Sequence, residues 1–106
     1  MDNNEIFRIS KEFTAGFLGH RTSAGHCSSV CSALHAYLAF EEINVSLTCG
    51  ELEHDNEIYE HWWLTLPDGT IIDPTADQFN ALFNTNYERV YFGVKPDHYT
   101  AEIMSD

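Results

Sequence analysis

Positive charge and long apolar runs are what this sequence has least of. The 106 residues include five Lys and Arg against 17 Asp and Glu, a formal net charge of −12 at pH 7. Proteins that bind nucleic acids or anionic membranes neutralise phosphate with Lys and Arg, so we expect neither partner. The acidic balance instead favours a basic protein partner. No apolar run approaches the roughly 20 residues of a membrane-spanning helix.

Cysteine is also scarce. Cys27, Cys31 and Cys49 are an odd number that cannot pair completely, so we expect free thiols in a reducing compartment. The opening residues, MDNNEIFRIS, are polar and acidic, whereas a secretory signal is basic and then apolar. We therefore expect a cytoplasmic protein.

The apolar residues that are present predict a packed globule. The hydrophobic fraction is 43% and the aromatic fraction is 13%, which argues against disorder. A chain of this length can build one core, and no internal repeat or linker divides it. We expect a single α+β domain over residues 1–106, with no cofactor.

The first part of the chain has helical periodicity. Residues 4–15 predict a short amphipathic helix capped by Asn3 or Asn4. The glycine-containing stretch 16–26 predicts a loop. Residues 27–40 predict the central helix of the domain, because their apolar side chains recur at helical spacing, at Cys27, Val30, Cys31, Leu34 and Leu38.

The rest of the chain predicts mainly strands. Residues 43–49 alternate apolar and polar side chains, as a half-buried strand does. The acidic residues 50–57 predict a loop, and a hairpin follows with strands at about 58–66 and 70–73. Residues 89–94 predict a final strand before an acidic tail.

The hairpin loop decides which side chains share a face of the ribbon. Residues 67–69, Pro-Asp-Gly, fit a three-residue loop with the glycine in the left-handed conformation. This loop pairs Leu66 with Thr70, so the numbers of paired residues sum to 136. His61 and Asp73 then lie on the same face, about 7–8 Å apart between α-carbons.

The residues around this pair have structural interpretations. Trp63 is on the same face and is expected to shield the pair from water. Asp73-Pro74 ends the second strand, because proline cannot donate to the ladder. Thr75 and Gln78 have the spacing of a capping box, which makes the segment after the strand a scaffold.

An aspartate that orients an imidazole makes two members of a catalytic triad, and Cys27 is the candidate for the third. It starts the central helix after a glycine-containing loop, where free N–H groups and the helix dipole lower the pKa of a thiol. We expect Cys27 to attack a carbonyl carbon, His61 to move the proton and Asp73 to orient His61. Cys31 lies inside the helix and is predicted to be a core residue.

The oxyanion of a tetrahedral intermediate needs at least two donors. The Cys27 N–H can supply one of them. His20, Ser23 and Gln78 are the candidates for the second. His20 and Ser23 lie in the loop before Cys27, and Gln78 has a competing role in the capping box.

The segments GHCSSVCSALHAYL, HWW and IDPT together resemble the core of the transglutaminase-like cysteine hydrolases, which belong to the papain-like fold. The resemblance covers about half of the chain. By position, Gly25 and Cys27 match the family's Gly-x-Cys, residues 61–63 its His-Ala-Trp and residues 73–75 its Asp-Pro-Thr. Gly50 matches the glycine that often ends the intervening strand.

The resemblance implies a papain-like core, with a central N-terminal helix on a small antiparallel sheet. It also implies amide chemistry on a peptide or protein substrate, as protease, deamidase or acyltransferase. The sequence departs from the family at Trp62, which replaces alanine, and at residues 41–42, where Glu-Glu replaces a helix-ending glycine. Calcium sites and accessory domains are not evident, which disfavours a cross-linking enzyme of the eukaryotic kind.

Two other interpretations remain open. Cys27, Cys31, His54 and His61 are ligand types for zinc, but a zinc site would leave Asp73 unexplained, and we expect no metal. The other is a non-catalytic acidic binding or inhibitor protein, such as an immunity protein or a nucleic-acid mimic. Such a protein would keep the fold and present its charge to a basic partner.

Overall fold

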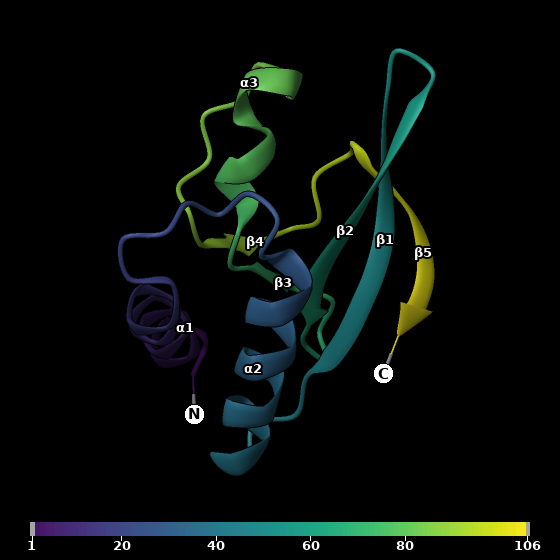
Figure 1. Ribbon diagram of the computed structural model, residues 1–106. Helices are drawn as coiled ribbons and strands as arrows, with labels where there is room; N and C mark the ends of the chain where they lie inside the picture. The colour runs from purple at the N-terminus through teal and green to yellow at the C-terminus, as the bar shows by residue number, and fades with distance from the viewer. Residues whose placement is uncertain (1, 106) are drawn as a thin grey trace.

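The computed structural model describes the backbone of residues 2–105 and the side chains of residues 2–99. Two long helices, α1 (Asn3–Leu18) and α2 (Cys27–Phe40), accompany a five-stranded antiparallel sheet of order β4-β3-β2-β1-β5 (Figure 1). The strands are β1 (Ser46–His54), β2 (Glu57–Thr65), β3 (Ile71–Asp73), β4 (Tyr91–Gly93) and β5 (Tyr99–Ser105). Two short helices, η1 (Ala76–Phe79) and α3 (Asn80–Phe83), lie between β3 and β4. The α+β prediction is confirmed.

Helix α1 is longer than the sequence pattern predicted, and its cap is a different residue. Asp2 caps it by accepting a hydrogen bond of 2.9 Å from the Glu5 N–H. The prediction of Asn3 or Asn4 as the cap was therefore wrong, because both residues are already helical. The helix continues to Leu18, so the loop before α2 is confined to residues 19–26.

Helix α2 begins and ends where the periodicity predicted, and it ends without glycine. Glu42 takes the left-handed conformation (φ 62°) that glycine usually supplies after a helix. The N–H of Ile43 then bonds back to the Leu38 carbonyl at 2.8 Å, and the N–H of Glu42 to the Ala39 carbonyl at 3.0 Å. These bonds satisfy the last carbonyls of the helix at the cost of strain at Glu42.

Strand β1 corrects the prediction of an acidic loop at residues 50–57. The strand starts at Ser46, three residues later than expected, and continues through Gly50 to His54. Only Asp55 and Asn56 form the turn, with φ values of 51° and 67°. Two consecutive left-handed residues are typical of a type I′ hairpin.

The Pro-Asp-Gly loop has the register predicted for it. The N–H of Leu66 donates to the Thr70 carbonyl at 2.8 Å, and Gly69 has φ 91°. The strand pairs Leu64–Ile72 and Thr65–Ile71 each sum to 136. His61 and Asp73 are thus on one face of the sheet, as expected.

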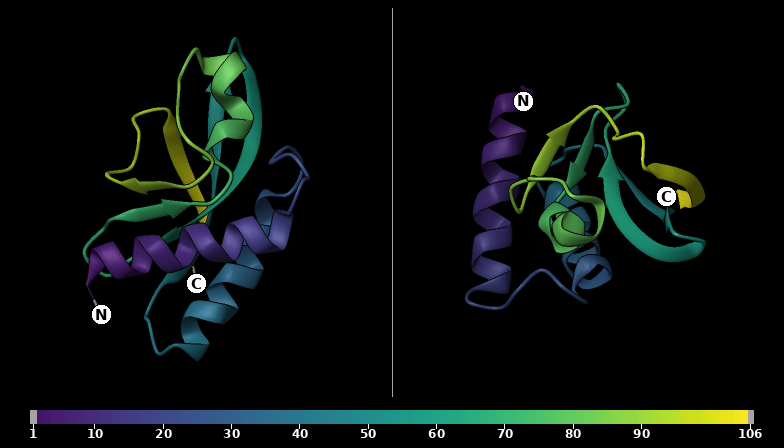
Figure 2. Two further views of the ribbon diagram at one scale, coloured as in Figure 1. Left: turned by 90° about the vertical axis from the view of Figure 1, so that its left-hand side faces the viewer. Right: turned by 90° about the horizontal axis from the view of Figure 1, so that it is seen from above.

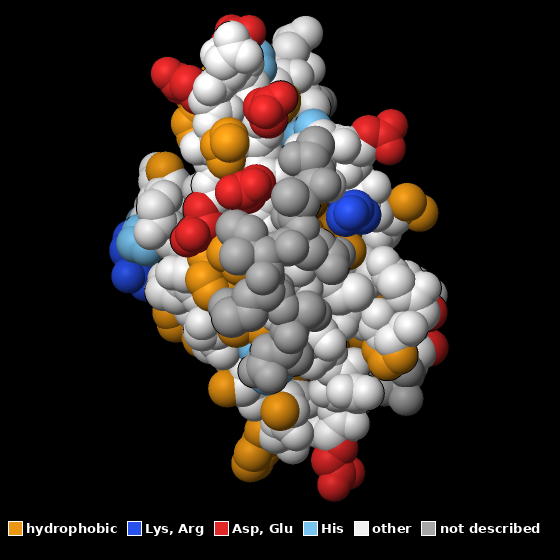
Figure 3. Space-filling model, turned by 90° about the vertical axis from the view of Figure 1, so that its right-hand side faces the viewer, with side chains coloured by type: hydrophobic (Ala, Val, Ile, Leu, Met, Phe, Trp, Pro, Cys, Tyr) orange, Lys and Arg blue, Asp and Glu red, His pale blue; other side chains and the backbone are white. Residues whose placement is uncertain are grey.

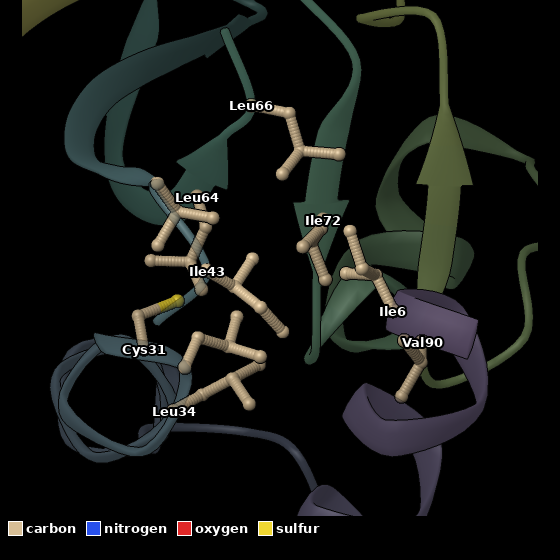
Figure 4. Close-up of a cluster of buried hydrophobic side chains, with 10 residues drawn as sticks. Ile6, Cys31, Leu34, Ile43, Leu64, Leu66, Ile72 and Val90 are labelled. Atoms are coloured by element: carbon tan, nitrogen blue, oxygen red, sulfur yellow. The ribbon is translucent and has the colours of Figure 1, made fainter. Parts of the chain in front are cut away.

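The helices and the sheet enclose one core, and the opposite face of the sheet carries a second. Figure 2 shows α1 lying across α2. Side chains from both helices pack against even-numbered residues of β2 and β3. Cys31 of α2, Leu64 of β2 and Ile72 of β3 belong to this core (Figure 4). Trp63 and Ile71 point to the other face and pack with Leu52, Tyr99 and the aromatic residues of η1 and α3.

Strand β5 was not predicted, since residues 96–106 read as an acidic tail. It pairs antiparallel with β1 at the outer edge of the sheet. Strand β4 lies within the predicted strand 89–94 but is shorter. None of the helices in residues 2–105 has the length and apolar character needed to span a lipid bilayer.

Candidate active site

Cys27 is the first residue of α2, and the loop before it leaves the helix start uncapped. Gly25 has φ 77°, a conformation that a residue with a β-carbon adopts only under strain. The N-cap residue His26 makes no side-chain capping bond, and the first helical bond runs from Val30 to the His26 carbonyl. The N–H groups of the first turn, including that of Cys27, therefore lack a helical acceptor. Such groups attract negative charge.

His61 and Asp73 form a fully buried hydrogen-bonded pair. The Nε2 atom of His61 lies 2.6 Å from Oδ2 of Asp73, and both side chains have 0% exposure. The other oxygen, Oδ1, accepts a bond of 3.0 Å from the Thr75 N–H. The hydroxyl of Tyr99 donates to Oδ2. A carboxylate without water is costly unless it is hydrogen-bonded, and these three donors satisfy it.

Aromatic rings enclose the imidazole of His61. Phe79 and Tyr99 meet it edge-on, with centroid distances of 5.2 and 5.5 Å. Trp63 lies 6.0 Å away and packs on Tyr99 at 4.9 Å. Trp63 has 0% exposure, so it has the shielding position predicted for it. The rings fix the orientation of the imidazole and exclude water from its bond to Asp73.

The thiol of Cys27 and the imidazole of His61 perturb each other. Burial raises the pKa of Cys27, but the hydrogen bond and charge of His61 outweigh it with the help of smaller contributions, and the net pKa is lowered from 9.0. Burial lowers the pKa of His61, while the charge and hydrogen bond of Asp73, with Cys27, raise it to about 9. Both shifts favour a thiolate beside an imidazolium. Since Nε2 is bonded to Asp73, Nδ1 is the ring nitrogen available to the sulfur.

Gln78 belongs to this site, and the capping-box prediction was wrong. Its Nε2 lies 2.9 Å from Nδ1 of His61 and 3.1 Å from Oγ1 of Thr75. A hydrogen bond from the same side chain helps to lower the pKa of Cys27. Thr75 makes no side-chain capping bond to η1. The segment after β3 therefore brings a polar side chain to the imidazole and the sulfur.

Trp62 supplies a backbone donor to the sulfur. Its N–H forms a hydrogen bond that lowers the pKa of Cys27. In a continued ladder of the 136 register, Trp62 would face residue 74, which is proline and has no N–H to donate. The paired part of β3 ends instead, and α2 brings Cys27 to the edge of β2.

The other two oxyanion candidates are not brought to the imidazole. His20 is exposed on the loop before α2, and among the described residues it makes no hydrogen bond, ion pair or ring contact with Cys27, His61 or Asp73. Ser23 is buried, and its hydroxyl has no hydrogen-bond partner among the described residues. Gln78, the candidate considered weaker for its capping role, is the one that reaches the site.

Cys31 and the zinc alternative can be judged from the same geometry. Cys31 is fully buried in the core between helices and sheet, and burial raises the pKa of its thiol well above 9.0. His54 lies at the end of the β1–β2 hairpin, 3.3 Å from Asp55 and against the ring of Phe83. Among the side chains of residues 2–99, no three His, Cys, Asp or Glu are grouped to hold a metal.

Tyr99 is the site residue that sequence reasoning missed. Burial and then the charge of Asp73 raise the pKa of its hydroxyl, which therefore stays protonated as a donor. The alternation of apolar residues at 99, 101 and 103 is a weak strand signal that could have indicated β5. Its contact with Asp73 depends on the pairing of β5 with β1, two strands far apart in the sequence, for which the sequence has no local signal.

Comparison of the chain with protein-family models, with curated proteins and with solved structures found no match.

Proposed function

We propose that this protein is a cysteine-dependent amide hydrolase or acyltransferase that acts on a peptide or protein substrate. One observation carries the proposal: a buried imidazole is held through Nε2 by Asp73 and hydrogen-bonds the half-buried sulfur of Cys27. A buried pair that shifts the pKa values of both partners toward an ion pair is typical of an activated nucleophile.

The proposed reaction has two halves. The Cys27 thiolate adds to the amide carbonyl carbon, and the π electrons move to the oxygen. The C–N bond then breaks as Nδ1–H of His61 gives its proton to the leaving nitrogen, which leaves a thioester and a free amine. Water or an amine adds to the thioester and gives a proton to Nδ1. The C–S bond breaks and restores the thiolate.

Donors for the oxyanion would come from two elements. The Cys27 N–H at the uncapped start of α2 is one. Gln78 is the other, because its amide donates to Nδ1 of His61 in the neutral state. Once Nδ1 carries a proton it no longer accepts, so the Gln78 N–H becomes available to the oxyanion.

The finer fold and the compartment are part of the same proposal. The order Cys27, His61, Asp73, on a helix start and two neighbouring strands, supports the papain-like, transglutaminase-like arrangement. The three cysteines are free thiols, and a thiol nucleophile has to stay reduced. We therefore place the protein in the cytoplasm.

Labelling with iodoacetamide at pH 6 tests this proposal. A thiol with an ordinary pKa of 9.0 is only about 0.1% thiolate at that pH. We expect Cys27 to be alkylated at least tenfold faster in the wild-type protein than in His61→Ala, as measured by peptide mapping, because Cys31 and Cys49 are buried and His61 is the main group that lowers the pKa of Cys27. Equal, slow labelling of all three would refute the proposal. A library of fluorogenic peptide amides and glutamine amides, with Cys27→Ala as the control, then identifies the reaction.

A second candidate function is non-catalytic binding of a basic protein. It is favoured by a hollow of about 570 Å³ at the C-terminal end of α2, which combines Ile6, Leu66 and other apolar residues with Glu41, Glu42 and Asp68. The same labelling experiment separates the two functions, because a binding protein has no need of a reactive Cys27.

A further inference from the structure

One edge of β2 is left open next to Cys27. The strand starts at Glu57, but β3 pairs with it only at Leu64 and Thr65. Residues 57–62 therefore have β1 on one side and, among the described residues, no strand on the other. Open edges of this kind accept extended peptides as additional strands.

The backbone groups on this edge are in register with the nucleophile. Leu66 donates its N–H to Thr70, and the pairing of β2 with β1 has no bulge. Because backbone groups alternate along a strand, those of Trp62, Glu60 and Ile58 point to the same side as those of Leu66. The Trp62 N–H meets the sulfur of Cys27. No backbone partner is found for Glu60 and Ile58 on this side within residues 2–105.

The surroundings of this edge are acidic. The β1–β2 hairpin carries five carboxylates, at Glu51, Glu53, Asp55, Glu57 and Glu60, and residues 22–88 contain no Lys or Arg. Figure 3 views the molecule from the side of β5, the other edge of the sheet, and acidic side chains are also visible there over the upper part of the face, the end at which the hairpin lies. Ile58 is 60% exposed beside Glu57. A bound strand would meet negative charge and an apolar contact.

We propose that the substrate is an extended basic peptide that pairs with the edge Ile58–Trp62 as a further strand. The peptide would lie beside β2 in line with β3, beyond the point at which β3 ends. We therefore assign it the direction of β3, which is antiparallel to β2. Its amides would bond to Glu60 and Ile58, and the bond to be cleaved would lie at Cys27. The inference rests on the proposed function, because it assigns the substrate class of the same site.

The test uses chloroacetyl-Lys-Ala-Lys-Ala-amide as a probe of that edge. The Cys27 sulfur forms a bond to the CH₂ carbon of the probe, and chloride leaves with the electrons of the C–Cl bond. The antiparallel direction places the peptide along Glu60 and Ile58. Four further probes carry one N-methyl group each, at successive amides, and labelling rates are measured by mass spectrometry.

We expect a period-two pattern. N-methylation at alternate positions removes a hydrogen bond to the edge and slows labelling about fivefold or more, while the positions between are unaffected. A probe with Glu in place of both Lys residues is also expected to react at least about fivefold more slowly. Equal rates for all N-methyl probes, with fast labelling by iodoacetamide, would overturn the inference and leave the proposed function intact. Slow iodoacetamide labelling would refute both.

Glu60→Pro tests the edge from the side of the protein. Proline removes the N–H that points to the open edge and spares the ladder to β1. We expect the ratio of the peptide-probe rate to the iodoacetamide rate to fall by about fivefold or more in this variant. An unchanged peptide rate in a folded variant would overturn the inference. If the variant does not fold, the N-methyl series on the wild-type protein still decides.

Discussion

Replacing Asp73 by Asn tests the central pair, because it removes the charge and keeps the shape. In the native site Oδ1 accepts from the Thr75 N–H, and Oδ2 accepts from His61 and Tyr99. An Asn side chain that keeps its oxygen toward Thr75 presents an amide N–H to Nε2 of His61. The imidazole then carries its proton on Nδ1, the wrong tautomer for accepting one from Cys27.

The expected effect on stability is measured in a Cys27→Ala background. With Cys27 present, the folded protein holds one proton on this pair, as an imidazolium beside a thiolate. In the pH range between the pKa values of imidazole and thiol, the unfolded chain also holds one, as a thiol with a neutral imidazole. The two linkages therefore cancel. Without Cys27 the titration of His61 stands alone.

The sign and the size follow from the pKa of His61. Its folded pKa is raised from 6.5 to about 9, so its contribution is fully present below pH 6.5 and is lost as the pH rises through 9. That shift corresponds to a ceiling of about 3 kcal/mol, part of which came from Cys27. With Asp73→Asn, burial is the remaining influence and lowers the pKa. The sign then reverses, and stability is lost as the pH falls.

The assay is urea unfolding of both proteins from pH 6 to 9.5. We expect the free-energy difference between them to shrink by up to about 3 kcal/mol across this range, because all other groups titrate alike in both. Asp68→Asn is the matched control, an exposed aspartate in the hairpin turn whose charge lies outside the site. A difference that is independent of pH would refute the coupling of His61 to Asp73.

Further predictions concern single residues of the site and the turns. Tyr99→Phe should lower the free energy of unfolding by about 1.5–3 kcal/mol, measured by urea unfolding, because a buried carboxylate loses a donor. Gln78→Leu should leave the iodoacetamide rate of Cys27 within about threefold but reduce turnover of the amide substrate found by the library about 100-fold, the scale of one lost oxyanion donor. Glu42→Gly should raise the melting temperature by several degrees, about 1 kcal/mol, since φ 62° strains a residue with a side chain. Gly69→Ala should lower it by a similar amount at φ 91°.

The parts of the site that depend on local geometry could be predicted from the sequence. Residues 67–69 determine the hairpin register, and the register decides that His61 and Asp73 share a face. The start of α2 at Cys27 follows from its glycine-containing loop and its apolar periodicity. These signals are short-range, because turn type and helical spacing are properties of neighbouring residues.

The elements that were not predicted lie in segments whose acidic composition is typical of loops. Gly50 and the acids after it read as a loop, although β1 continues through them and pairs with β2 to its end. The turn signal at Asp55-Asn56 was hidden in the same acidic stretch. Tyr99 reaches Asp73 only because β5 pairs with β1, and a contact over 26 residues is set by tertiary packing rather than by propensity.

Pro74 shows how a structural stop also shapes the site. Without an N–H it cannot continue the ladder to Trp62, so the ladder between β2 and β3 ends at Leu64–Ile72, β3 ends at Asp73, and the chain turns into η1. That departure leaves the Trp62 N–H free for the sulfur of Cys27. The same turn carries Gln78 back over the imidazole. A strand continued beyond Asp73 would pair with the open edge of β2 and displace both donors, the Trp62 N–H and the Gln78 amide. The segment after Asp73, which the sequence indicated to be a scaffold, is therefore what opens β2 to the nucleophile.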